Sequence, residues 1–151
     1  MATVEVTFTP LPVHVRTARL VATAVARRSG VAESLLDEVR LAVGEACSRA
    51  VEAHQRHCPG EPIRVSLTDD GEQFQVVVTD AVPGSERDLP AGPGLMAPGL
   101  PAAPRESTAP LRLPDDVGLA VIAGLADDVR IGPAGPGTSV TMIWKRRTAV
   151  Y

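Results

Sequence analysis

Glu45 and Arg49 lie four positions apart within a segment whose apolar pattern predicts a long helix. This spacing brings a carboxylate and a guanidinium onto one helix face, in the acid-first order that favours an ion pair. A carboxylate can accept a proton as a general base, whereas a guanidinium only donates hydrogen bonds and cannot ligate a cation. The alternative interpretation is a solvated face of charged side chains, shared with Glu38 and Glu52, in which each pair contributes only about 0.3–0.5 kcal/mol.

The first half of the chain carries the elements that must position this pair. Strict alternation over residues 3–8 predicts a strand, and helices are expected over 13–28 and 32–57, each followed by a glycine or Pro-Gly stop signal. On the first helix the apolar residues at helical spacing are Val13, Ala18, Leu20, Val21, Ala24 and Val25. On the second helix, repeats of three and four predict one buried face made of Leu35, Val39, Ala42, Ala46, Ala50 and Ala53.

A hairpin and a long irregular segment follow the second helix. Alternating apolar residues predict strands over 63–67 and 74–78, with Asp80 at the end of the second strand. Residues 81–114 then hold eight of the chain's 14 prolines and show no periodicity. A segment so rich in residues without an N–H cannot sustain a helix or a strand ladder. We therefore expect a Pro/Gly-rich flexible lid or an inserted loop.

Regular structure is expected again after this loop. A helix over 115–126 begins with two acidic residues that suit its N-terminus, and strands over 129–131 and 140–144 are joined by a turn over 132–137. The order of elements is strand, two helices, two strands, loop, helix and two strands. It predicts a single domain over 1–151, an α/β two-layer sandwich with helices on one face of a mostly antiparallel, mixed sheet.

Four short motifs occur in a fixed order along these elements. They are Glu45-Ala46-Cys47-Ser48-Arg49-Ala50 in the long helix, Asp80-Ala81-Val82-Pro83-Gly84 at a strand end, Asp116-Val117-Gly118-Leu119 opening a helix, and Gly137-Thr138-Ser139-Val140 starting the last strand. Each motif alone is a weak indication of function; Asp80 alone, for example, would be an ordinary turn residue. As an ordered set covering nearly the whole chain, they resemble the Bergerat-fold (GHKL) ATPases, and most closely the anti-sigma-factor serine kinases of bacterial partner-switching systems.

The resemblance implies a site for ATP or ADP, with its base at the end of the hairpin. In the family, the aspartate at this point accepts a hydrogen bond from the adenine amino group, and Asp80 matches it. Glycines beside the aspartate let the backbone approach the base closely. Gly84 matches one of them, whereas Val82 stands where the first glycine is usual, which should narrow the floor of the pocket.

Two further motifs imply the phosphate end and the closing edge of the same site. Gly118 and Leu119 match the start of the helix whose backbone N–H groups receive phosphate. Gly137 and Thr138 match the motif that closes the site under the adenine. The loop over 81–114 lies where the family has its mobile ATP lid.

The helix motif departs from the family pattern at one position. There a glutamate, matched by Glu45, serves as general base toward a target hydroxyl, and an asparagine four residues later holds Mg²⁺ through its carbonyl oxygen. In this chain the asparagine position is Arg49, which has no acceptor atom and repels a cation. A carboxylate paired with an arginine is also a poorer proton acceptor. We therefore expect an altered or weak ATP site, with Arg49 contacting phosphate directly and no magnesium held in the usual way.

Composition argues against several other classes of function. The chain has 15 basic and 18 acidic residues, a net charge of −3, which does not favour nucleic acid or a membrane surface as partner. No apolar run approaches the roughly 20 residues needed to cross a bilayer, and the start of the chain lacks a signal-peptide pattern, so a cytoplasmic protein is expected. His54, His57 and Cys58 have loose spacing and no fourth ligand, which predicts a helix-end cluster and not a metal site.

The function implied by the resemblance is regulation of transcription through protein binding. The chain would sequester a sigma factor, or exchange between a sigma factor and an anti-sigma-factor antagonist. Arg19 matches a family position that contacts both partners, and Arg16 lies one turn before it. Family members often dimerise through this N-terminal region, which implies a homodimer. Two alternatives remain: an active ATP-dependent serine kinase that phosphorylates the antagonist with Glu45 as base, and a pseudokinase scaffold whose binding ignores nucleotide.

Overall fold

All the helices and strands expected from the sequence are present. The computed structural model describes residues 2–83 and 115–145, apart from the side chains of 115–117. In chain order the elements are β1 (Ala2–Phe8), α1 (Pro12–Arg28), α2 (Glu33–His57), β2 (Ile63–Asp69), β3 (Gln73–Thr79), α3 (Asp115–Leu125), β4 (Asp128–Ala134) and β5 (Gly137–Lys145). The lid or loop expected over 81–114 lies outside the described residues from position 84 onward.

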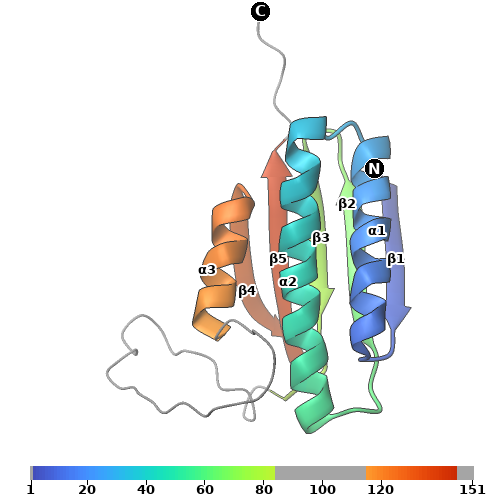
Figure 1. The fold of residues 1–151 in the computed structure, drawn as a ribbon, viewed down its shortest axis with the longest axis vertical. Coiled ribbons are helices and arrows are strands. Elements are labelled where there is room, and N and C mark those ends of the chain that lie inside the picture. The colour runs from blue at the N-terminus through green and yellow to red at the C-terminus, as the bar shows by residue number, and fades with distance from the viewer. Residues whose placement is uncertain (1, 84–114, 146–151) are drawn as a thin grey trace, which may run out of the picture.

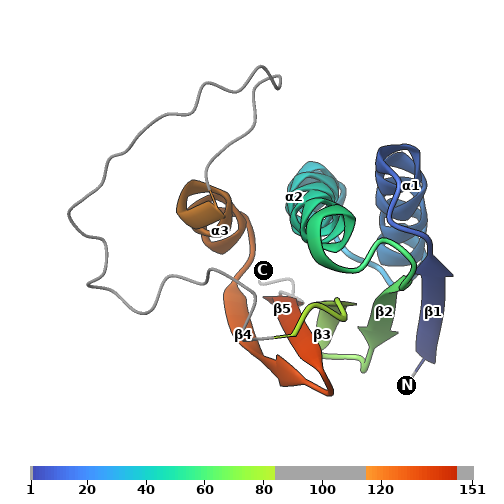
Figure 2. The same cartoon turned by 90° about the horizontal axis from the view of Figure 1, so that it is seen from below.

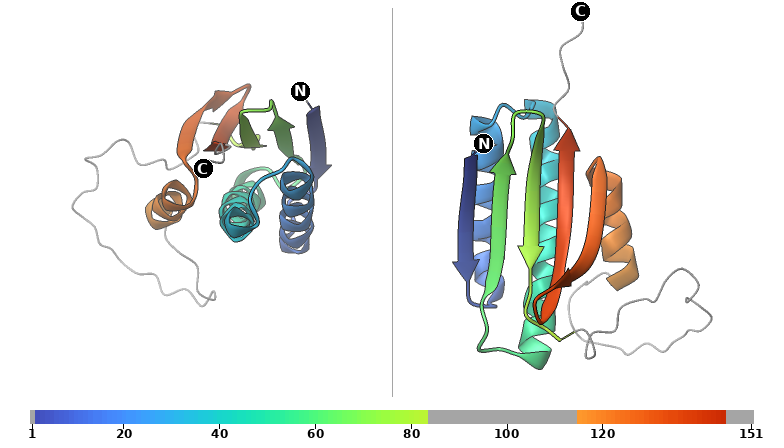
Figure 3. Two further views of the ribbon diagram at one scale, coloured as in Figure 1. Left: turned by 90° about the horizontal axis from the view of Figure 1, so that it is seen from above. Right: turned by 180° about the vertical axis from the view of Figure 1, so that it is seen from behind.

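The five strands form one open sheet in the order β1-β2-β3-β5-β4. Each neighbouring pair is antiparallel, so the described strands contain no parallel pair. The three helices cover one face of the sheet, and the view from behind shows that they leave the other face uncovered (Figures 1, 2 and 3). The expected α/β two-layer sandwich with helices on one face is therefore confirmed.

The central helix α2 lies between α1 and α3 above the sheet (Figure 2). Four positions of its predicted face are buried, whereas Leu35 and Ala53 are only half-buried. The buried surface also includes Leu36, Val43, Cys47, Val51 and His54. It is wider than a single stripe because α2 has a neighbour on each side as well as the sheet below it.

On α1, two of the larger apolar residues at helical spacing face outward. Val13 is 65% exposed and Leu20 is 56% exposed. The helix instead buries Val15, Thr23 and a row of alanines, Ala18, Ala22 and Ala26. Small side chains let α1 pack closely along α2, so the buried face is set by steric fit and not by hydrophobicity alone.

The turn between β4 and β5 is tighter than expected. The strands pair as far as Ala134 and Gly137, which leaves only Gly135 and Pro136 in the turn. Gly135 has a φ of +60°, a backbone conformation that glycine adopts readily. Pro133 is accommodated within β4 because this strand is at the edge of the sheet, where a missing N–H breaks no second ladder.

The chain's one tryptophan ties the end of β5 to the end of α3. Trp144 is buried against Phe74, with ring centroids 6.2 Å apart. Its indole N–H donates a hydrogen bond of 2.9 Å to the carbonyl oxygen of Leu125. Within the described residues, no helix is both long and apolar enough to span a membrane.

A matched pair of substitutions tests the assignment of core and surface. Leu67 on β2 is 1% exposed, whereas Leu41 on α2 is 55% exposed. Leu67→Ala removes buried methyl groups and leaves a cavity, so we expect it to lower the free energy of unfolding by about 2–5 kcal/mol. Leu41→Ala should change it by no more than about 0.5 kcal/mol. Urea unfolding of both variants measures the difference. Similar losses of unfolding free energy in the two variants would contradict this assignment.

The two cysteines should differ in reactivity. Burial raises the pKa of the Cys47 thiol to about 12, an effect that the nearby charge of Arg19 only partly opposes. Cys58 is half-buried at the end of α2. Because only the thiolate attacks a disulfide reagent, we expect about one reactive thiol per native chain near pH 8 and about two in guanidinium chloride. Cys58→Ser should abolish the native reaction, whereas fast modification of both thiols in the native protein would show that Cys47 is accessible.

Candidate functional site

The start of α3 lies against the second half of α2. At this contact Gly118 faces the two charged residues of the helix motif. A Cβ on Gly118 would lie 3.3 Å from Cδ of Glu45 and 3.4 Å from Cδ of Arg49, and closer still to the Glu45 carboxylate oxygen. Glycine at 118 therefore leaves space for these two side chains, whose flexible ends would have to shift to admit a Cβ. The structure brings these three predicted residues together, with Leu119 next to them packed against the core.

The second group of predicted residues joins the end of β3 to the start of β5. The Asp80 N–H donates to the Thr138 carbonyl oxygen at 2.9 Å, and the Thr138 N–H donates to Asp80 Oδ1 at 3.2 Å. A Cβ on Gly137 would lie 2.6 Å from the carbonyl carbon of Asp80 and 2.8 Å from Cα of Ala81. Such a contact with backbone atoms cannot be relieved by a rotamer change, so Gly137 is needed for the close approach.

Val82 completes the local geometry of Asp80. Its N–H donates to the same Oδ1 atom of Asp80 at 3.0 Å, and its side chain is fully buried. The carboxylate oxygen thus accepts two backbone N–H groups, which orient it. The expectation that Val82 narrows a pocket stays a prediction, and Gly84 lies outside the described residues.

His54 is a site residue that the sequence analysis missed. It was assigned to a helix-end cluster, but its side chain is fully buried and reaches the loop that carries Asp80. Its Nε2 accepts a hydrogen bond from the Ala81 N–H at 2.9 Å, and its Nδ1 lies 2.9 Å from the Glu61 carbonyl oxygen. The only available signal was a polar residue on a predicted buried helix. Among the residues that the structure describes, no group of three or more His, Cys, Asp or Glu side chains could hold a metal ion.

The two arginines of α1 have different surroundings. Arg16 is exposed on the outer side of the helix, with Val13 and Leu20 on the same stripe. Arg19 is half-buried and crosses α2 at Gly44, where a Cβ would lie 2.7 Å from Cδ of Arg19. Because α1 and α3 lie on opposite sides of α2 (Figure 2), these arginines do not join the residues around Gly118.

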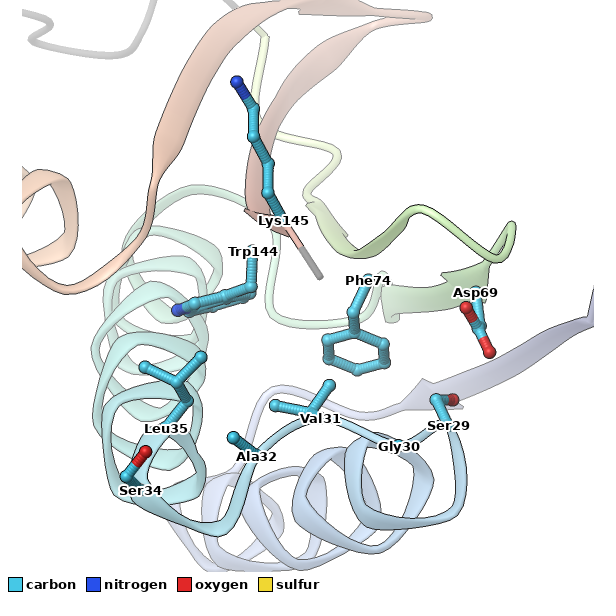
Figure 4. A pocket seen from close by; sticks show the side chains of 10 residues that line it. All are labelled: Ser29, Gly30, Val31, Ala32, Ser34, Leu35, Asp69, Phe74, Trp144 and Lys145. Carbon is cyan, nitrogen blue, oxygen red and sulfur yellow. The ribbon is translucent and has the colours of Figure 1, made fainter. Parts of the chain in front are cut away.

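A pocket of about 340 Å³ opens at the other end of the sandwich (Figure 4). Phe74, Trp144, Val31 and Leu35 supply its apolar lining, and Asp69 and Lys145 are also part of its wall. The described residues of the predicted nucleotide site are absent from its lining, since they lie on the second half of α2, after β3, and at the starts of α3 and β5. This pocket is therefore separate from the candidate site.

Comparison with known proteins agrees with this arrangement. The chain is similar to the crystal structure of the RsbU and RsbW domains of Rv1364c from Mycobacterium tuberculosis, with a TM-score of 0.64 and 20% sequence identity. That match covers 99% of this chain but 34% of the solved chain, and at this identity it shows the fold alone. A search of the curated proteins gave no match. The family model of the histidine kinase-like ATPase domain, however, matches residues 8–144. The resemblance drawn from the four motifs is thus confirmed, and the chain belongs to the histidine kinase-like ATPase domain family.

Proposed function

We propose that this protein is a regulator of the partner-switching type, which binds a sigma factor or its antagonist and has an altered nucleotide site. The observation that carries the proposal is the position of Arg49. Its side chain lies beside Glu45 at the start of α3, where Gly118 leaves room for both. A guanidinium at this point changes which ligands the site can hold, while the surrounding fold of the family is kept.

The chemistry around Asp80 and α3 fits a nucleotide. Asp80 is buried and its carboxylate is oriented by two backbone N–H groups, as a selective acceptor for a base amino group requires. The N-terminus of α3 supplies backbone N–H groups and the positive end of the helix dipole. Arg49 adds a permanent positive charge beside that helix start, and a guanidinium binds phosphate oxygens well. Base and phosphate would therefore lie at the same end of the sandwich, with ATP or ADP as the ligand.

The donor set beside Gly118 does not fit Mg²⁺ held in the family's usual way. Of the two side chains there, Glu45 can ligate a hard cation, but Arg49 offers only N–H donors and repels positive charge. The guanidinium can itself neutralise phosphate charge without a metal ion. We therefore propose nucleotide binding that does not depend on magnesium.

Protein binding is supported by the outer face of α1. Val13, Arg16, Thr17, Leu20 and Ala24 are all exposed and share one stripe of the helix. An apolar stripe that includes an arginine is typical of surfaces that contact other proteins. Arg19, which matches the family's partner-contact position, is half-buried and crosses toward α2. We propose that this stripe and Arg19 contact the partner protein, and that a homodimer would form through the same N-terminal region.

Nucleotide titration with and without magnesium tests the altered site. We expect wild-type protein to bind ATP similarly in Mg²⁺ and in chelator, as measured by calorimetry. Arg49→Asn removes a charge-assisted phosphate contact and restores an amide oxygen. It should therefore raise the affinity with Mg²⁺ and weaken metal-free binding by about tenfold or more. Arg40→Asn, an exposed arginine on the same helix, is the matched control and should behave as wild type.

Three results would overturn parts of this proposal. If the ATP affinity of Arg49→Asn equals that of wild type both with Mg²⁺ and with chelator, Arg49 does not contact the nucleotide. Metal-enhanced binding by wild type, together with phosphate transfer to a purified antagonist, would instead establish an active serine kinase with Glu45 as base. Normal partner binding without any nucleotide binding would favour a scaffold.

Substitutions on α1 test the partner surface. Capture of bound proteins from the native cytoplasm, followed by mass spectrometry, should recover a sigma factor or an anti-sigma-factor antagonist. Because hot spots on an interface commonly cost more than 2 kcal/mol on truncation, Arg16→Ala and Leu20→Ala together should lower this capture by about tenfold or more. Leu41→Ala truncates an equally exposed leucine on α2 and should leave it unchanged. This location of the surface would be refuted if the α1 variant and Leu41→Ala lost capture equally. Undiminished capture by the α1 variant would refute it as well.

A further inference from the structure

His54 is polar, yet it is fully buried near the end of α2, and both of its ring nitrogens have a backbone partner. One partner, Ala81, follows directly after Asp80, the proposed base-recognition residue. The other, Glu61, lies in the connection between α2 and β2. The ring therefore bridges two backbone segments that come from different parts of the chain.

The chemistry of the two partners determines the state of the ring. The Ala81 N–H can only donate, so Nε2 must be an acceptor that carries no proton. The Glu61 carbonyl oxygen can only accept, so Nδ1 must carry the proton. His54 is thus a neutral imidazole in the Nδ1–H tautomer. A proton on Nε2 would face the Ala81 N–H, and an Nδ1 without a proton would face the Glu61 carbonyl oxygen.

The Ala81 hydrogen bond completes a row of three paired backbone groups. The Asp80 N–H donates to Thr138, and the Val82 N–H donates to Asp80 Oδ1. Between them, the Ala81 N–H donates to His54, so this one bond ties the loop to α2. On the other side, Gly137 leaves no space for the Asp80–Ala81 backbone to move toward β5. The loop is held between a histidine ring and a strand.

We propose that His54 is a positioning residue of the nucleotide site, which aims the Asp80 carboxylate through its hydrogen bond with Ala81. This inference rests on the proposed function, because it assigns Asp80 to the nucleotide base. His54 itself does not touch the ligand. Its contribution is to fix the peptide that follows Asp80, so that the carboxylate is already oriented before the nucleotide binds.

Two substitutions separate the two hydrogen bonds of the ring. The side-chain nitrogen of asparagine is at the position of Nδ1, so His54→Asn can keep the donor toward Glu61 but has no acceptor that reaches Ala81. The side-chain oxygen of glutamine reaches the position of Nε2, so His54→Gln keeps the acceptor for Ala81. We expect His54→Asn to weaken ATP binding in chelator by about tenfold, with His54→Gln within about twofold of wild type. His57→Asn changes an exposed histidine near the same helix end and serves as the control.

Nuclear magnetic resonance provides readouts that do not depend on nucleotide binding. The ¹⁵N shifts of the wild-type ring should report the Nδ1–H tautomer, and amide exchange at Ala81 should be faster in His54→Asn than in His54→Gln. An Nε2–H tautomer, or ATP binding by folded His54→Asn equal to wild type, would overturn the proposal. If wild type binds no ATP in either buffer, the proposed nucleotide site fails and the positioning role fails with it. The tautomer and exchange results then still decide separately whether His54 holds the loop.

Discussion

The close approach of β3 and β5 at one end of the sheet is the constraint on which the candidate site depends. No Cβ fits at Gly137, because the backbone of Asp80 and Ala81 occupies that space. Thr138 can therefore exchange hydrogen bonds with both the main chain and the carboxylate of Asp80. A buried carboxylate is costly unless its oxygens are paired, and here the strand ends supply those partners. The orientation of Asp80 thus depends on the packing of β3 against β5 as well as on the local hydrogen bond from Val82.

Much of the fold could be predicted from the sequence, because hydrophobic periodicity reports secondary structure directly. The strands and helices lie where alternation and helical repeats place them. Burial on α1 was harder to predict. Val13 and Leu20 are more hydrophobic than the alanines beside them, yet the alanines are buried, because close helix packing selects small side chains. Periodicity identifies an apolar stripe but does not identify the partner that must fit against it.

The candidate site, too, could be predicted only in part from the sequence. Glu45 and Arg49 could be placed on one helix face from their spacing alone, whereas their contact with Gly118 joins two elements far apart in sequence and was expected only from the family resemblance. His54 could not be assigned. Its partners are backbone groups 7 and 27 residues away, and any residue type supplies such groups, so they have no sequence signature. Buried polar residues whose hydrogen-bond partners are backbone groups are therefore the ones that a sequence reveals least.

The indole of Trp144 has a consequence for α3 as a whole. Its hydrogen bond attaches the last turn of the helix to the end of β5, while the first turn lies against Glu45 and Arg49. The helix is therefore joined to the sheet at its C-terminal end and packed against α2 along its length. Because the chain has one tryptophan, its indole fluorescence reports on the junction between α3 and β5.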